Sequence, residues 1–151
     1  MASLERGALT ELLVLALESA TAAPAVALLE GERTVALRAA GAGDSATAFL
    51  LPAVEAVLAE AGALLSRVGL FALAIGPGSF TGLRVGLATV QGLAFGTDVL
   101  AAPVSSLSAL ALAAGSGTQA VAALLDARRG DVYAAAFGPG DRRQLRPEPV
   151  K

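Results

Sequence analysis

The chain has 151 residues, of which 55% are apolar and 16% are charged, and its formal net charge is −2. A chain of this length and apolar content can bury a core without disulfides or a metal. It contains neither Cys nor His. That excludes a thiolate nucleophile, a Ser-His-Asp triad and a His-ligated zinc site, and it makes the reducing cytoplasm the natural compartment.

Charge and hydropathy also limit what the chain can bind. Basic side chains concentrate only between Arg142 and Lys151, where acidic residues are interleaved. Nucleic-acid-binding domains usually carry a clustered basic face, so no strong direct contact with nucleic acid is expected. The apolar run Leu12–Leu17 is far shorter than the roughly 20 residues that span a bilayer, so no membrane contact is expected. Residues 1–11 lack the apolar stretch of a signal peptide and are interpreted as an N-terminal extension.

The first half of the chain predicts three strands and then a helix. Short apolar runs end in polar or glycine-containing turns, which is the pattern of strands joined by hairpins. From Phe49 the apolar residues change to helical spacing, and Pro52 suits a first helical turn. The expected strands are Leu12–Leu17, Ala25–Leu29 and Thr34–Arg38, and the expected helix is Phe49–Leu65.

The next part continues with alternating strands and helices. Leu70–Ile75 is continuously apolar, as a central strand covered on both faces would be. After a glycine-rich loop we expect a helix over Leu83–Phe95, a strand over Val99–Val104 and a helix that Ser105 or Ser106 caps and that reaches Ala114. Residues 12–114 are therefore predicted to form one α/β lobe with a mixed sheet and flanking helices.

The chain then repeats its opening. Val121–Leu125, the acidic turn at Asp126 and Val132–Phe137 repeat the order strand, acidic turn, strand that begins the first lobe. Such an internal repeat indicates a second, related unit. Residues 119–137 are interpreted as its beginning, and residues 138–151, rich in Pro and Arg, as a disordered tail.

The loop Gly76–Gly82 joins a buried strand to a helix, where glycines let the backbone approach a phosphate and helix N–H groups are free. Its spacing fits neither the P-loop, which needs Lys after the last Gly, nor the G-x-G-x-x-G dinucleotide fingerprint. From the residues alone, a tight structural turn and an anion site both remain open.

The amino-acid sequence of this loop resembles that of a known family. The segment Ile75-Gly-Pro-Gly-Ser-Phe-Thr-Gly-Leu-Arg-Val-Gly-Leu87, followed by Gln91-Gly-Leu-Ala94, is similar to the hallmark of the TsaB family, also called YeaZ. Further matches follow in the family's order: Leu15–Thr21, although the family usually has Asp at the position of Glu18, then Pro103–Leu107 and Leu125–Tyr133.

The resemblance implies an actin-like, sugar-kinase-like (ASKHA) fold of two related lobes. It also implies a non-catalytic subunit of the tRNA N6-threonylcarbamoyladenosine (t6A37) complex, with a TsaD-like catalytic paralogue and a TsaE-like ATPase as partners and a homodimer when alone. The paralogue binds metal through a His pair, which this chain lacks. Two features depart from the family: Ala46 and Thr47 replace its usual His-Ser pair, and the second lobe is short.

A helix that only covers a sheet should keep a polar outer face, yet Leu83–Phe95 contains only Arg84, Thr89 and Gln91 as polar residues. Its glycines would also permit close backbone approach. We therefore expect a protein–protein interface on the two long helices, although covering the sheet alone remains the alternative. The predicted contact residues are Leu50, Val54, Val57, Leu58, Gly82, Arg84, Val85, Gly86, Thr89, Val90 and Leu93.

A nucleotide-binding phosphotransferase is the alternative function. In actin-like ATPases, carboxylates at turns such as those of Glu18 and Asp126 hold Mg²⁺; the alternative is that each carboxylate hydrogen-bonds its own turn. No cofactor is required in the favoured interpretation, which has no catalytic residue and no metal ligand but allows weak binding of ATP or ADP with Mg²⁺. The candidate phosphate-binding residues are Glu18, Gly76, Gly78, Ser79, Thr81 and Asp126.

Overall fold

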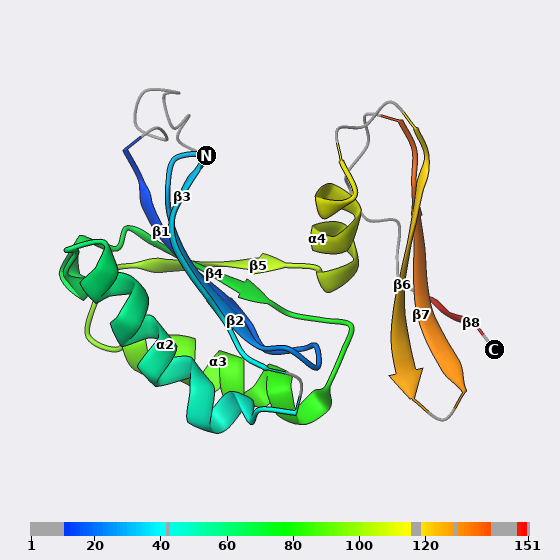
Figure 1. Ribbon diagram of the computed structural model, residues 1–151, viewed down its shortest axis with the longest axis horizontal. Helices are drawn as coiled ribbons and strands as arrows, with labels where there is room; N and C mark the ends of the chain where they lie inside the picture. Colours follow the sequence, from blue (N-terminus) through cyan, green and yellow to red (C-terminus); the bar gives the residue numbers. More distant parts are fainter. Residues whose placement is uncertain (1–10, 42, 116–118, 129, 140–147, 151) are drawn as a thin grey trace.

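The computed structural model describes residues 11–139 and 148–150, apart from positions 42, 116–118 and 129 and the side chains of 148–150. These residues form a five-stranded sheet with its helices and a second sheet of three strands (Figure 1). The first sheet contains β1 (Leu13–Glu18), β2 (Ala25–Glu30), β3 (Arg33–Ala39), β4 (Leu70–Ala74) and β5 (Leu100–Val104). The helices are α2 (Ala46–Glu60), α3 (Phe80–Ala94), α4 (Ser106–Ala113) and the short 3-10 helix η1 (Leu65–Arg67), and the second sheet contains β6 (Val121–Arg128), β7 (Asp131–Phe137) and β8 (Glu148–Val150).

The five-stranded sheet is mixed, with the order β3-β2-β1-β4-β5. β1 pairs antiparallel with β2 and parallel with β4, so that Leu15 lies opposite Leu28 on one side and Phe71 on the other. β4 in turn pairs parallel with β5. Because parallel neighbours need a crossover, α2 precedes β4 and α3 precedes β5. The predicted α/β lobe with a mixed sheet is confirmed.

The main core lies between this sheet and the two long helices. Alternate strand residues point toward α2 and α3, and Leu15, Leu28 and Phe71 are at most 1% exposed. On the other face, Ala16 and Ala72 are only half-buried. The expectation that β4 is covered on both faces is therefore wrong in part, since its apolar run combines one buried face with an alanine-rich, partly open face.

Helix α2 begins and ends earlier than predicted. It starts at Ala46, which places Pro52 inside the helix rather than in its first turn. It stops because Gly62 adopts a φ of 61° and because the N–H groups of Gly62 and Ala63 bond to the carbonyls of Ala59 and Leu58. This pair of bonds is the Schellman motif, in which glycine supplies the left-handed residue. The predicted end at Leu65 extended past this stop to the first residue of η1, which is a separate element.

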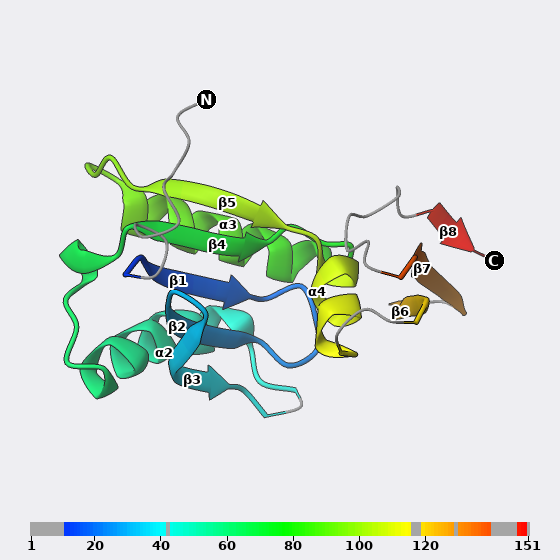
Figure 2. The same ribbon diagram turned by 90° about the horizontal axis from the view of Figure 1, so that it is seen from above.

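The second sheet lies beyond α4 (Figure 2). α4 packs on one face of the β6–β7 hairpin, where its Leu107 and Ala111 form a small core with Ala123, Ala135 and Phe137. β8 pairs antiparallel with β7, so the prediction of a disordered tail is wrong for Glu148–Val150. Positions 140–147 and 151 of that tail, and 1–10 of the N-terminal extension, lie outside the described residues. In the described part of the chain no helix is long and apolar enough to cross a membrane.

Candidate functional site

The loop between β4 and α3 packs against the turn that follows β1. The Ser79 N–H donates to the Ala20 carbonyl over 2.7 Å, and the Ser79 hydroxyl accepts the Gly82 N–H over 3.2 Å as the N-cap of α3. A Cβ at Gly78 would overlap the Ala20 carbonyl. The glycines therefore allow two turns of the same chain to approach closely. This supports the tight structural turn, which the sequence left open beside an anion site.

The two turn carboxylates bond to backbone N–H groups of their own turns. Glu18 Oε1 accepts the N–H groups of Ala20 and Thr21, the latter over 2.8 Å. Asp126 Oδ1 accepts the Arg128 N–H over 2.7 Å. The equivalent positions in the repeat thus carry equivalent bonds. This pattern favours the structural role of both carboxylates over Mg²⁺ binding.

A pocket of about 960 Å³ lies between the two sheets. It brings together Gly78, Ser79, Thr81 and Asp126 among the predicted phosphate-binding residues. Glu18 and Gly76 do not line it, and Glu18 borders a different hollow on the alanine-rich face of the sheet. The predicted pair of carboxylates therefore does not meet at one site. Within the described ranges, no three Asp or Glu side chains gather as a metal site.

Most of the predicted partner contacts lie on the faces of α2 and α3 that are turned into the protein's own core. These residues line the inner faces, and the protein's own sheet covers them. The prediction that they face a partner is therefore wrong for the buried ones, while Arg84 is exposed. The buried residues are Leu50, Val54, Val57, Leu58, Gly82, Gly86 and Val90, and the half-buried ones are Val85, Thr89 and Leu93.

The glycines of α3 explain this error. A Cβ at Gly82 would overlap the Ser19 carbonyl, and a Cβ at Gly86 would overlap the Ser19 hydroxyl. Ser19 is 1% exposed and donates from its hydroxyl to the Gly82 carbonyl over 2.9 Å. Because Gly82 and Gly86 have no side chains, the turn after β1 can pack directly against α3. The space at these glycines is filled by this turn and not by a second subunit.

The opposite side of α3 remains apolar and open. We call the stripe Phe80, Arg84, Leu87, Gln91 and Phe95 the α3 outer face, because helical spacing places these residues on one side of the helix. Phe80 is 73% exposed, Leu87 49% and Phe95 89%. Ile75, at the end of β4, is 56% exposed beside this face. Arg84 was among the predicted contacts, whereas the other residues of this face and Ile75 are candidate contacts that the sequence interpretation missed.

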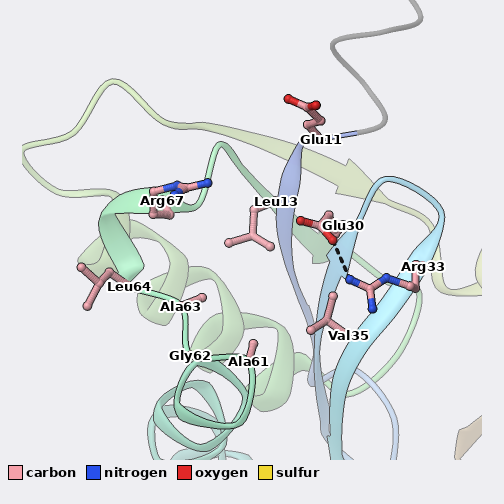
Figure 3. A pocket seen from close by; sticks show the side chains of 10 residues that line it. All are labelled: Glu11, Leu13, Glu30, Arg33, Val35, Ala61, Gly62, Ala63, Leu64 and Arg67. Atoms are coloured by element: carbon pink, nitrogen blue, oxygen red, sulfur yellow. Dashed lines mark hydrogen bonds and ion pairs between the residues drawn. The ribbon is translucent and has the colours of Figure 1, made fainter.

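A further hollow of about 380 Å³ lies at the other end of the sheet (Figure 3). Leu13 and Val35 form part of its apolar wall, Arg67 lies on one side, and the ion pair between Glu30 and Arg33, at 2.6 Å, lies on the other. No residue of this hollow was a candidate from the sequence. Its charged groups are exposed on a shallow rim.

Comparison with known proteins places this geometry in a family. The family model described as TsaD, tRNA N6-adenosine threonylcarbamoyltransferase, matches residues 42–143. The TsaB proteins of Haemophilus influenzae and Escherichia coli are 45% and 37% identical to the chain and align with 81% and 82% of it. The structure of YeaZ from Pseudomonas aeruginosa is similar with a TM-score of 0.81 and 36% identity, over 92% of this chain and 66% of that one.

The chain belongs to the TsaB family. TsaB relatives that align over most of the chain carry the family name, and the YeaZ structure superposes on nearly all of it. The TsaB resemblance seen in the sequence is thus confirmed, together with the actin-like fold of related lobes. The chain spans about half the length of the curated TsaB relatives it matches, 52% for Haemophilus influenzae and 54% for Escherichia coli.

Proposed function

We propose that this chain is a non-catalytic partner subunit in tRNA threonylcarbamoyladenosine biosynthesis and that it supports a TsaD-type catalytic protein. Its relatives are named tRNA threonylcarbamoyladenosine biosynthesis protein TsaB. The matching family model is itself a TsaD model, which fits a subunit related to its catalytic partner. A subunit of this kind contributes a binding surface rather than bond-making groups.

The α3 outer face is the observation that carries the proposal. Phe80 and Leu87 project from α3, Phe95 directly follows its last residue, and Arg84 is the one charged residue of the helix. Monomeric proteins seldom leave such side chains together on one face, and a contiguous apolar patch marks an interaction site. Full burial of a Leu or Phe side chain contributes about 1.5–3 kcal/mol, so covering this face would stabilise a complex.

The chemistry of the chain supports a non-catalytic role. Without His or Cys, catalysis would rest on carboxylates or hydroxyls. The carboxylates of Glu18 and Asp126 accept N–H groups in their own turns, and the Ser79 hydroxyl caps α3. A nucleophile needs a base within hydrogen-bond reach, and among the described residues the Ser79 hydroxyl bonds to the Gly82 N–H and to no basic side chain. The phosphotransferase alternative therefore has no observation in its favour.

The remaining parts of the proposal follow from the same role. A TsaE-like ATPase is the third member of the assembly, and a second copy covers the α3 outer face when the TsaD-type protein is absent. The site of action is the cytoplasm, which suits a chain without Cys. The subunit works without a cofactor, and weak binding of ATP or ADP with Mg²⁺ stays a prediction.

Binding of a purified TsaD-type protein by the 151-residue chain and by Leu87→Asp tests the proposal. A carboxylate at this position would have to be desolvated in the complex, so affinity should fall at least about tenfold in isothermal titration calorimetry. Leu37→Asp is the matched control, because Leu37 is similarly exposed at 55% but lies on β3. Equal loss of affinity in both variants, or no binding by the unmodified chain, would refute the proposal.

A further inference from the structure

A groove of about 230 Å³ runs between α3 and the end of β4. Its walls are Leu73, Ala74, Ile75, Phe80, Leu83 and Leu87, with Arg84 as the single charged side chain; we call this the Arg84 groove. Phe80 and Leu87 belong both to the groove and to the α3 outer face. A partner that covers the outer face therefore also closes the groove.

Arg84 is held in place but is not neutralised. Its guanidinium carbon lies 5.4 Å from the centre of the Phe80 ring, within the range of a cation–π contact. Arg33 and Arg38 pair with Glu30 and Glu60, whereas no carboxylate among the described residues pairs with Arg84. A cation at the edge of an apolar groove is thus available to a partner that supplies a carboxylate.

We propose that the Arg84 groove selects a partner surface that offers an apolar side chain followed by a carboxylate. The apolar side chain fills the groove, and the carboxylate accepts hydrogen bonds from the Arg84 guanidinium. Once the surrounding apolar groups exclude water, an unpaired Arg84 would oppose association, so the carboxylate decides which surface fits. This inference rests on the proposed function, since it names the chemistry of the partner at the same face.

Other occupants fit this surface less well. The α3 outer face of a second copy brings no carboxylate, because Phe80–Ala94 contains neither Asp nor Glu. Nucleic acids and anionic membranes are bound by clusters of cations, and Arg84 is the only charged residue of α3. A protein surface with an apolar side chain followed by a carboxylate is therefore the favoured partner, and self-association through this face should be the weaker of the two.

Charge reversal at Arg84 tests the inference with the TsaD-type protein as probe. Arg84→Glu should weaken binding at least about 30-fold, because a desolvated charge pair becomes a like-charge contact. Arg84→Gln should weaken it less. Arg67→Glu is the matched control, since Arg67 is also exposed and without an ion pair in the described part of the chain but lies on η1. Unchanged melting temperatures would show that all variants fold.

The partner's carboxylate is identified by rescue. Surface Asp and Glu residues of the TsaD-type protein are changed to Lys one at a time, and one of them should restore binding to Arg84→Glu while weakening binding to the unmodified chain. If the unmodified chain binds and Arg84→Glu binds equally well, the inference is overturned and the proposed function stands. If the unmodified chain does not bind, both are overturned. Stronger self-association than partner binding would identify a second copy as the occupant and overturn the inference.

Discussion

At the scale of single residues, the lack of a side chain at Gly86 allows the turn after β1 to pack closely against α3. A Cβ on Gly86 would meet both the buried hydroxyl of Ser19, which donates to the Gly82 carbonyl, and the side chain of Leu73 on β4. Glycine inside a helix costs about 1 kcal/mol relative to alanine. The close contact between the β1 turn and α3 has to offset that cost.

Gly86→Ala should therefore destabilise the protein. The added methyl group would push Ser19 away from Gly82, and overpacking of a closely packed site typically costs about 1–3 kcal/mol, which exceeds the gain in helix propensity. We expect a net loss of up to about 2 kcal/mol in the free energy of unfolding, measured by urea denaturation.

Gly92→Ala is the control for this experiment. Gly92 lies in the same helix, and an added Cβ there would meet nothing within 4 Å outside the helix's own backbone, so the substitution should stabilise the protein by about 1 kcal/mol or less. Adding Ser19→Ala to Gly86→Ala should recover part of the loss, because the smaller side chain makes room. A rise in stability for Gly86→Ala as large as that for Gly92→Ala would show that the Ser19 contact does not constrain the helix.

At the scale of elements, the sequence predicted where the strands and helices lie better than which way they face. Apolar runs of strand length, separated by turns at residues such as Gly31, placed every strand of the first sheet. The orientation of α3 was missed because the helix is apolar nearly all round, so periodicity cannot separate its inner from its outer side. Side-chain size would have indicated the orientation of the helix. Its buried side carries Gly82, Gly86 and Val90, and the larger side chains of the α3 outer face lie opposite.

The four sheet edges also differ in ways that bear on stability. β3 carries Arg33 and Arg38, and β5 contains Pro103, both of which discourage pairing with another strand. β6 is longer and is uncharged from Val121 to Leu125, and Leu124 is 59% exposed. Within the described residues β6 pairs only with β7, whereas its counterpart in the repeat, β1, pairs with strands on both sides.

Hydrogen exchange should reveal this difference between β1 and β6. Val14–Leu17 of β1 are paired on both sides, so their amides should exchange only through large-scale unfolding. Alternate amides of β6 that point away from β7 should exchange at least about tenfold faster, because an edge strand leaves them open to water. Amide exchange followed by NMR gives the residue-level rates. Uniform protection along β6 would mean that another strand covers its edge.

At the scale of the whole molecule, the pocket between the two sheets gathers four of the six predicted phosphate-binding residues. Its lining combines Gly78, Ser79 and Thr81 of the first lobe with Asp126 and Tyr133 of the second. The resemblance of the loop predicted family membership, but it could not predict how the loop's polar groups are used. That depends on contacts between turns far apart in the chain, such as the bond from Ser79 to Ala20.

The shift in melting temperature with Mg-ATP distinguishes a site that binds nucleotide tightly from one that binds it weakly. Since Asp126 bonds its own turn and Glu18 lies outside the pocket, we expect at most weak binding. A nucleotide at a concentration equal to its dissociation constant stabilises the fold by about 0.4 kcal/mol, which is about 1 °C for a chain of this size. A site 100-fold tighter would contribute about 2.7 kcal/mol and shift melting by about 5 °C or more. A shift of that size, lost in Asp126→Asn and kept in Glu18→Gln, would restore the pocket between the sheets as a nucleotide site.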